Sequence, residues 1–267
     1  MTVFQALVLG VVQGLAEFLP ISSSAHLSLA PWLLGWPEPG LAFDASLHLG
    51  TLVAVLWFFQ AEWAKLARAA LEIARTRRIS GPEQRRVLFL VIATIPGGVG
   101  GLLLAEQAAT VFRAPVVTGA ALIILGVILW AADRFAPRER ELADMRWTDA
   151  VLIGLAQVVA LVPGVSRSGA TMTMGRGLRM HRESAAVFSF LMSMPITLAA
   201  VTVELPKALR APGAAVPLLI GVLASAVSGW LAISVLLRYV SRHSFGLFAA
   251  YRLVFGAIVL VLVALRG

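Results

Sequence analysis

Long uncharged apolar stretches constrain this chain more than any other feature of its sequence. A helix needs about twenty apolar residues to cross the ~30 Å hydrocarbon core of a bilayer. Five runs near this length and a shorter sixth occur, at residues 45–61, 87–105, 114–132, 184–203, 211–237 and 253–265. We therefore expect an all-α integral membrane protein, a polytopic helix bundle with six full spans.

The composition excludes the ordinary soluble classes. Of the 267 residues, 59% are hydrophobic and 13% are charged, whereas about 25% of the residues of a typical soluble domain are charged. Cysteine is absent, which excludes a disulfide scaffold and a thiolate metal site. The 22 Lys and Arg exceed the 14 Asp and Glu, but only 8% of the residues are aromatic. The expected partner is therefore the lipid bilayer, and no nucleic acid.

The basic residues are distributed unevenly over the connections between the apolar runs. Sixteen of them lie in four connections, at residues 62–86, 134–146, 176–182 and 238–242. Four lie on the opposite side, at Arg113, Lys207, Arg210 and Arg266. Because cytoplasmic loops carry an excess of Lys and Arg, the four connections are predicted to be cytoplasmic and both termini external. Apolar residues at helical spacing within 62–78 predict either a helix on the inner membrane surface or a solvated charged connector.

Two further apolar segments do not suit a simple crossing. Residues 3–36 hold Glu17 and Pro20 in the middle of an apolar stretch, and residues 150–175 hold Arg167 after a Pro-Gly turn. Irregular backbone at membrane depth occurs where it is buried in protein or lines a cavity. Each segment is therefore predicted to be a re-entrant pair of short helices, a broken helix.

An internal repeat connects the two broken segments. Shifting the chain by 144 residues pairs Gln13 with Gln157, and a slip of one residue then pairs Ser23 with Ser166. Since three spans lie between the segments, the second copy enters the membrane from the opposite face, and the repeat is inverted. The chain is predicted to be a single membrane domain, 1–267, with repeat 1 at about 1–133 and repeat 2 at about 147–267, joined by the basic cytoplasmic loop 134–146.

The first break carries an acid, three hydroxyls and an imidazole. Gln13 and Glu17 are four residues apart and share one helix face. Residues 22–24 are serines that stand where a second short helix begins, and His26 lies in its first turn. The serines are either helix caps or ligands. Glu17 is a functional candidate because an acid is unfavourable in a membrane-embedded segment, and His26 is a candidate base or nucleophile.

The second break combines a cation with hydroxyls. Arg167 lies between Ser166 and Ser168 at the start of another short helix. A guanidinium beside N-terminal helix amides is suited to binding phosphate, and an ion pair with Glu17 is compatible with that interpretation. His48, four residues after Asp44, is either a group of the site or part of an intrahelical polar pair. Arg252 is expected to snorkel at a helix end.

These motifs resemble those of one known family. Residues 13–26 read QGLAEFLPISSSAH and residues 163–169 read PGVSRSG. Together, in this order and at this separation, they resemble the undecaprenyl pyrophosphate phosphatase family of the bacitracin-resistance type. Residues 43–55 and 183–193 are also similar to the family, so the resemblance covers nearly the whole chain.

The resemblance implies an enzyme of the bacterial plasma membrane that removes the terminal phosphate of undecaprenyl pyrophosphate. This reaction recycles the lipid carrier of cell-wall peptidoglycan synthesis, and the resemblance favours an active site open to the periplasm or cell exterior. It implies catalytic roles for Ser23 and His26 beside Glu17, and phosphate binding by Arg167. The candidate substrate-binding residues are Ser22, Ser24, Gly164, Ser166, Ser168, Gly169, Thr171 and His48. A divalent cation, Mg or Ca, is also implied, with Glu17 and Gln13 as its candidate ligands.

The sequence leaves three points open. Attack on phosphorus comes from Ser23 activated by His26, from a water activated by His26, or from His26 itself, and we prefer the first. Because inverted repeats with broken helices are also transporter architecture, the second candidate function is a transporter or flippase of a phosphate-bearing prenyl lipid. Small residues at 97–101 permit close helix packing within or between chains, so a homodimer stays open.

Overall fold

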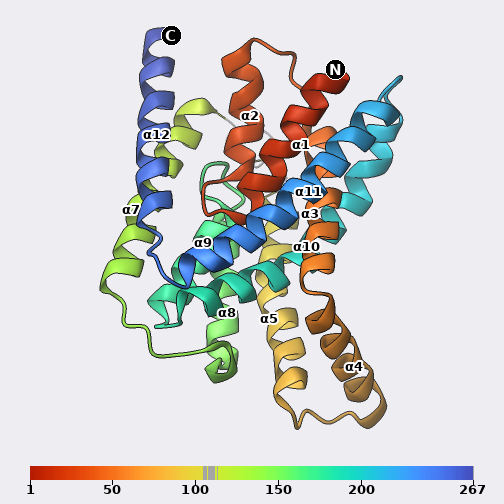
Figure 1. The fold of residues 1–267 in the computed structure, drawn as a ribbon, viewed down its shortest axis with the longest axis vertical. Helices are drawn as coiled ribbons and strands as arrows, with labels where there is room; N and C mark the ends of the chain where they lie inside the picture. Colours follow the sequence, from red (N-terminus) through yellow and green to blue (C-terminus); the bar gives the residue numbers. More distant parts are fainter. Residues whose placement is uncertain (105–106, 108–111, 113, 267) are drawn as a thin grey trace.

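The computed structural model describes residues 1–104, 107, 112 and 114–266. The regular secondary structure of these residues is helical, apart from one isolated bridge between Arg140 and Met180. This confirms the all-α class (Figure 1). The helices are α1 (Val3–Phe18), α2 (Ser23–Leu34), α3 (Leu41–Phe58), α4 (Gln60–Thr76), α5 (Pro82–Leu103), α7 (Pro115–Phe135), the 3-10 helix η2 (Leu142–Asp144), α8 (Trp147–Val159), α9 (Arg167–Gly177), α10 (Arg182–Leu209), α11 (Ala215–Val240) and α12 (Gly246–Arg266).

Six of the described helices are long and apolar enough to cross a membrane, namely α3, α5, α7, α10, α11 and α12. They coincide with the six predicted runs, so this is a multi-pass membrane protein. The largest difference is in α12, which begins at Gly246 and not at residue 253. Arg252 therefore lies inside the helix, and its side chain is 0% exposed. The expectation that Arg252 snorkels at a helix end is wrong, because its guanidinium is hydrogen-bonded to buried backbone carbonyls.

The two predicted breaks are both present. The first separates α1 from α2 at residues 19–22, and the second separates α8 from α9 at residues 160–166. α1 packs against α11, whereas α8 packs against α5. Both packings are close: a Cβ on Gly10 would lie 2.2 Å from the carbonyl oxygen of Gly221, and a Cβ on Gly154 would lie 2.6 Å from that of Ala93. The missing side chains thus let each short helix lie directly against a long one.

The charged segment 62–78 forms most of helix α4. It packs against α5, with Leu66 and Ala69 buried and an ion pair between Glu62 and Arg86. The segment is therefore helical, and its position on the inner membrane surface stays a prediction. Figure 1 shows the α4–α5 and α7–α8 connections, two of the four basic ones, at one end of the molecule and both chain termini at the other end.

Two of the small residues at 97–101 pack closely against another helix of the same chain. A Cβ on Gly97 would lie 2.2 Å from the side-chain nitrogen of Gln157, and one on Gly100 would lie 2.7 Å from Val158. Both contacts are made by α8. This packing fixes the position of α8 against α5, and a homodimer stays a prediction.

A polar cluster anchors the far end of α9. Arg176 is fully buried and its Nε donates to Asp133 Oδ1 at 3.0 Å, where Arg182 Nε also donates at 2.7 Å. Nearby, Arg140 Nη2 donates to Asp149 Oδ2 at 2.5 Å, and this hydrogen bond raises the pKa of Arg140 above its ordinary value. The cluster ties the 136–146 connection to α8, α9 and α10.

Candidate functional site

The two breaks end in the same kind of helix cap. Ser22 precedes α2 at φ 76°, and its Oγ accepts from the amide of Ala25 at 3.4 Å. Ser166 precedes α9 at φ 70°, and its Oγ accepts from the amide of Gly169 at 3.0 Å. The two caps are 144 residues apart, the same shift that pairs the preceding helices. The predicted slip, which pairs Ser23 with Ser166, does not hold at the caps, because the cap geometry pairs Ser22 with Ser166.

The tips of the two breaks touch. The amide of Gly164 donates to Ser22 Oγ at 3.1 Å. In the opposite direction, Ser168 Oγ donates to the carbonyl oxygens of Glu17 at 3.0 Å and Leu19 at 3.2 Å, close to where α1 ends. The Ser168 hydroxyl therefore donates to backbone carbonyls at the end of α1, which would otherwise be unpaired.

Glu17 is the centre of the polar contacts between the breaks. Its Oε2 accepts from Ser23 Oγ at 2.6 Å and from Gln13 Nε2 at 3.1 Å. Its Oε1 accepts from Arg167 Nη2 at 2.6 Å. The fourth neighbour is His48, whose Nε2 lies 3.5 Å from Oε2. Because the carboxylate is only 7% exposed, these charged and polar partners are what make its burial tolerable.

A cavity of about 210 Å³ opens beside this carboxylate. Its polar lining comes from both breaks and from α3, α8 and α10: Glu17, Ser23, Ser24, His48, Gln157, Ser166, Arg167 and Thr197. The rest of the lining includes apolar residues of α10 and of the second break, among them Ile196, Ala200 and Leu161. An acid, hydroxyls and a guanidinium on one side and an apolar wall on the other suit a ligand with a charged head and an apolar chain.

His26 lies elsewhere. Its Nδ1 is 2.7 Å from the carbonyl oxygen of Ser22, and its Nε2 is 2.6 Å from the hydroxyl of Tyr251. Its ring is nearly parallel to the rings of Tyr251 and Phe255 of α12, with centroids 5.7 and 4.7 Å away. His26 is not among the residues that line the 210 Å³ cavity, and its ring nitrogens contact Ser22 and Tyr251 and not the Ser23 hydroxyl that the preferred alternative has it activate.

The remaining candidate residues support the two breaks away from the cavity. Gly164 has φ 96°, and a Cβ there would lie 2.4 Å from the carbonyl oxygen of Thr118, so only glycine fits this turn. Thr171 is buried and contacts Ser189 Oγ at 2.7 Å. Together with Ser22, Ser168 and Gly169, these residues contact backbone and neighbouring helices and not the cavity.

Gln157 was not among the residues predicted for the site. It lines the cavity with a side chain that is 4% exposed, and neither its Oε1 nor its Nε2 has a hydrogen-bond partner. Leaving a buried amide unpaired is costly, so such a group is suited to meeting a ligand. The signal that identifies it was already in the sequence: the 144-residue repeat pairs Gln157 with Gln13.

The described residues contain no group of three or more His, Asp or Glu arranged to hold a metal ion. Gln13, which does not line the cavity, nevertheless offers an unpaired oxygen on a side chain next to that of Glu17. Gln13 Oε1 is buried without a hydrogen-bond partner, and the amide nitrogen of the same side chain contacts Glu17. One carboxylate and one amide oxygen fit a hard cation that takes its other ligands from substrate and water.

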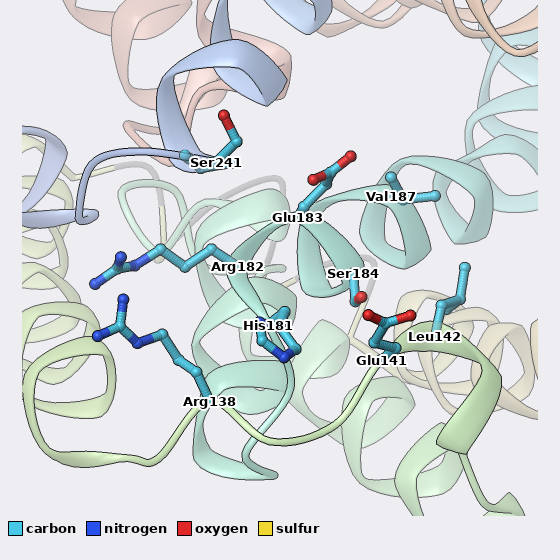
Figure 2. Close-up of a pocket in the computed structure, with 10 residues that line it drawn as sticks. Arg138, Glu141, Leu142, His181, Arg182, Glu183, Ser184, Val187 and Ser241 are labelled. Carbon is cyan, nitrogen blue, oxygen red and sulfur yellow. The ribbon is translucent and has the colours of Figure 1, made fainter.

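A second cavity, of about 370 Å³, lies between the 136–146 connection, the start of α10 and the end of α11. Figure 2 shows that charged residues of both signs surround it, with Arg138 and Arg182 extending side by side and Glu141 and Glu183 on other parts of the rim. It contains none of the residues predicted for the site. Arg182 is already paired with Asp133, so this cavity offers no comparable set of converging groups.

Comparisons with known proteins match the chain over its full length. The sequence profile of the family described as bacitracin resistance protein BacA matches residues 6–258. An undecaprenyl-diphosphatase of Gemmatimonas aurantiaca is 60% identical over 266 residues, covering 100% of both chains. Undecaprenyl-diphosphatases of Pelotomaculum thermopropionicum and Moorella thermoacetica are 51% and 46% identical, over 100% of this chain and 98% and 100% of theirs.

Proposed function

This chain belongs to the bacitracin resistance protein BacA family, and we propose that the cavity between its two breaks is where it acts as an undecaprenyl-diphosphatase. The substrate is undecaprenyl pyrophosphate, from which the terminal phosphate is removed. The observation that carries the proposal is the position of Glu17, which is hydrogen-bonded to Ser23 at 2.6 Å and to Arg167 at 2.6 Å. An acid, a hydroxyl and a guanidinium from two distant segments thus face one cavity.

The proposed architecture is a pair of inverted repeats whose broken helices re-enter the membrane. Three features support it: apart from α4, the order of short and long helices recurs in the two halves, the caps Ser22 and Ser166 correspond, and the glycines Gly10 and Gly154 correspond. The packing also exchanges partners between the halves, since α1 packs on α11 of the other half and α8 packs on α5 of the other half. This exchange is what a two-fold relation across the middle of the membrane produces.

In the proposed reaction, Ser23 is the nucleophile. Glu17 Oε2 takes the Ser23 proton while Ser23 Oγ forms a bond to the terminal phosphorus. The bond from that phosphorus to the bridging oxygen breaks, and the electron pair leaves with undecaprenyl phosphate. A water then attacks the phosphorus of the phosphoserine, the bond from phosphorus to Ser23 Oγ breaks, Glu17 returns its proton to that oxygen, and inorganic phosphate leaves. Splitting the displacement into two steps in this way is covalent catalysis.

Arg167 and His48 have supporting roles in this reaction, Arg167 at the terminal phosphate and His48 at the carboxylate of Glu17. Arg167 pairs with Glu17; with substrate bound, its planar guanidinium is proposed to turn to the terminal phosphate and to stabilise the charge that develops there. His48, 3.5 Å from the carboxylate, is the imidazole proposed to hold Glu17 in place. The role that the sequence analysis preferred for His26, the base that activates Ser23, is proposed here for Glu17.

Gln13 and Glu17 are proposed to hold a divalent cation, Mg or Ca, because Gln13 Oε1 is a buried acceptor without a donor. When bound, the cation neutralises negative charge on the phosphate oxygens. The residues of this chain do the rest: Ser23 attacks, Glu17 accepts the proton, and Arg167 orients the terminal phosphate.

The site is proposed to open toward the outer face of the bacterial plasma membrane. The basic connections are predicted to be cytoplasmic, and two of them lie at the end of the molecule opposite to the termini (Figure 1). The cavity is lined by Ala45 in the first half of α3, by Gly97 in the second half of α5 and by Ala200 in the second half of α10. These halves adjoin the less basic connections. Because the relatives are named as enzymes, no transporter activity is proposed.

The test is the rate of phosphate release from undecaprenyl pyrophosphate by the purified full chain in detergent. Ser23→Ala is expected to lower kcat by about 10³-fold, because it removes the attacking oxygen. His26→Gln is expected to lower it by less than about 10-fold, since one hydrogen bond to Tyr251 is lost. Ser28→Ala, on the same helix with its hydroxyl on the carbonyl of Ala25, is the control and keeps the wild-type rate. A Ser23→Ala variant that keeps more than a tenth of the activity would overturn the proposed nucleophile.

A further inference from the structure

Arg252 is a buried cation that the proposed reaction does not use. It lies in α12, and its side chain is 0% exposed, as is that of only one other arginine of the described chain, Arg176. An ionisable residue inside a membrane-spanning helix is a functional candidate in its own right. The question is therefore what its guanidinium contacts.

The guanidinium connects the two breaks from behind. Its Nη1 donates to the carbonyl oxygen of Pro20 in the first break at 3.1 Å. Its Nη2 donates to the carbonyl oxygens of Gly164 and Val165 in the second break, at 2.8 and 2.9 Å. Its Nε donates to Leu122 of α7 at 3.2 Å. From a helix outside the two breaks, Arg252 is thus hydrogen-bonded to backbone carbonyls of both loops at once, across 232 and 88 positions of sequence.

The charge of Arg252 is not neutralised by an acid. The two buried arginines differ in this respect: Arg176 is paired with Asp133, whereas no ion pair of the described residues includes Arg252. On the cavity side of Arg252, the charges of Glu17 and Arg167 offset each other, and the N-termini of α2 and α9 add positive partial charge. A buried cation without a counter-ion is unfavourable. A bound anion would remove that imbalance.

The helix behind Arg167 is shaped around this guanidinium. A Cβ on Gly169 would lie 2.8 Å from Arg252 Nη1, so any larger residue would displace the guanidinium. Gly169 is also the residue whose amide donates to the Ser166 cap. The cap of α9 and the guanidinium therefore depend on the same small residue.

We infer that Arg252 is a positioning residue for the hydrolysis. By donating to carbonyls of both breaks it holds Ser23 and Arg167 at a fixed separation, and its uncompensated charge favours a pyrophosphate in the cavity in front of it. The inference rests on the proposed function of that cavity. Arg252 touches neither Ser23 nor Arg167, so it acts through the backbone of the two breaks.

The first experiment compares Arg252→Lys with Arg252→Gln, using the full chain in detergent and undecaprenyl pyrophosphate as substrate. Lysine keeps the charge but loses the planar fork of donors. It is expected to lower kcat by about 10-fold while KM stays within about 3-fold. Glutamine also loses the charge, and is expected to raise KM by about 10-fold in addition. A residue that only stabilises the fold would lower the active fraction in both variants and leave KM unchanged.

Arg176→Lys is the matched control, because Arg176 is equally buried and also donates to backbone carbonyls. Its thermal unfolding midpoint is expected to fall as far as that of Arg252→Lys, without a change in KM or in kcat per folded molecule. If Arg252→Gln has wild-type kcat and KM, the inference is overturned. If instead the wild-type chain releases no phosphate, it is the proposed function that fails.

A double-mutant cycle keeps the inference testable if Arg252→Gln folds poorly. Gly169→Ala should displace the guanidinium and lower kcat by about 10-fold in the wild-type background, but by less than about 3-fold beside Arg252→Lys, whose flexible stem gives way. Gly175→Ala is the control on the same helix, since its Cβ would meet Ala185 at 2.8 Å and not Arg252. Its effect should be the same in both backgrounds. Additive effects for Gly169 and Arg252 would contradict the inference.

Discussion

The α1–α2 break and the α8–α9 break have nearly the same backbone at the cap but different side chains around it. Ser22 has φ 76° and ψ 93°, Ser166 has φ 70° and ψ 116°, and each hydroxyl lies 3.2 Å from that of the serine two residues later. At positions 144 residues apart, however, Glu17 corresponds to Leu161, and Ser23 corresponds to Arg167. The first break therefore carries the acid and the proposed nucleophile, and the second carries the cation.

This division explains why neither half makes a site alone. A break that held both Glu17 and Arg167 on one short helix would pair them side by side, whereas here the ion pair spans the gap between two helix ends. The same cap backbone occurs at both breaks, and the side chains around it carry complementary charges. Substitutions at corresponding positions of the two breaks test this account.

The largest expected effect is that of Glu17→Gln in the first break. The amide cannot accept the Ser23 proton, and general-base catalysis is worth about 10²–10⁴-fold, so kcat should fall by about 10³-fold. Phosphate release from undecaprenyl pyrophosphate measures it. Glu204→Gln, which breaks only the Glu204–Lys207 pair on α10, should keep the wild-type rate. A Glu17→Gln variant within 10% of wild type would mean that the first break does not supply the base.

In the second break, Arg167→Lys is expected to lower kcat/KM by about 10²-fold, because a lysine keeps the charge but not the bidentate geometry toward phosphate. The effect is smaller than that of Glu17→Gln since part of the electrostatic attraction is retained. The kinetic constants of Arg179→Lys, at the surface pair with Glu139, serve as the reference. Full activity of Arg167→Lys would show that the second break binds the substrate without a directed contact.

Much of this arrangement followed from the sequence because its signals are local. Charges and prolines inside apolar runs located both breaks, and the spacing of Gln13, Glu17 and Ser23 placed three groups of the site. The direction of His26 did not follow, because its partner Tyr251 is 225 residues away and a hydrogen bond between two side chains leaves no pattern along the chain. The contacts of Arg252 could not be predicted for a related reason: its acceptors are backbone carbonyls, which every residue has.

The glutamines on the helices before the breaks offer a subtler comparison. Gln13 donates to Glu17, whereas Gln157 has no hydrogen-bond partner and lines the cavity. We expect Gln13→Leu to lower kcat and Gln157→Leu to raise KM, each by about 10-fold, the equivalent of one buried hydrogen bond to a charged group. The separate determination of kcat and KM for undecaprenyl pyrophosphate distinguishes them. If both variants changed the same constant, the two helices would have the same role.

The smallest expected effect concerns the caps themselves. A serine held at positive φ costs about 1–3 kcal/mol that glycine largely avoids, while replacing a cap serine by glycine loses only a few tenths of a kcal/mol. Ser166→Gly should therefore leave the thermal unfolding midpoint unchanged or raise it. Ser22→Gly has the same gain, but it also removes the acceptor of the Gly164 amide, and an unpaired buried amide costs about 1–3 kcal/mol. The midpoint of Ser22→Gly in detergent should thus lie below that of Ser166→Gly. Equal midpoints would mean that the hydrogen bond between the two tips contributes nothing, and that the two breaks are held together by side chains further back.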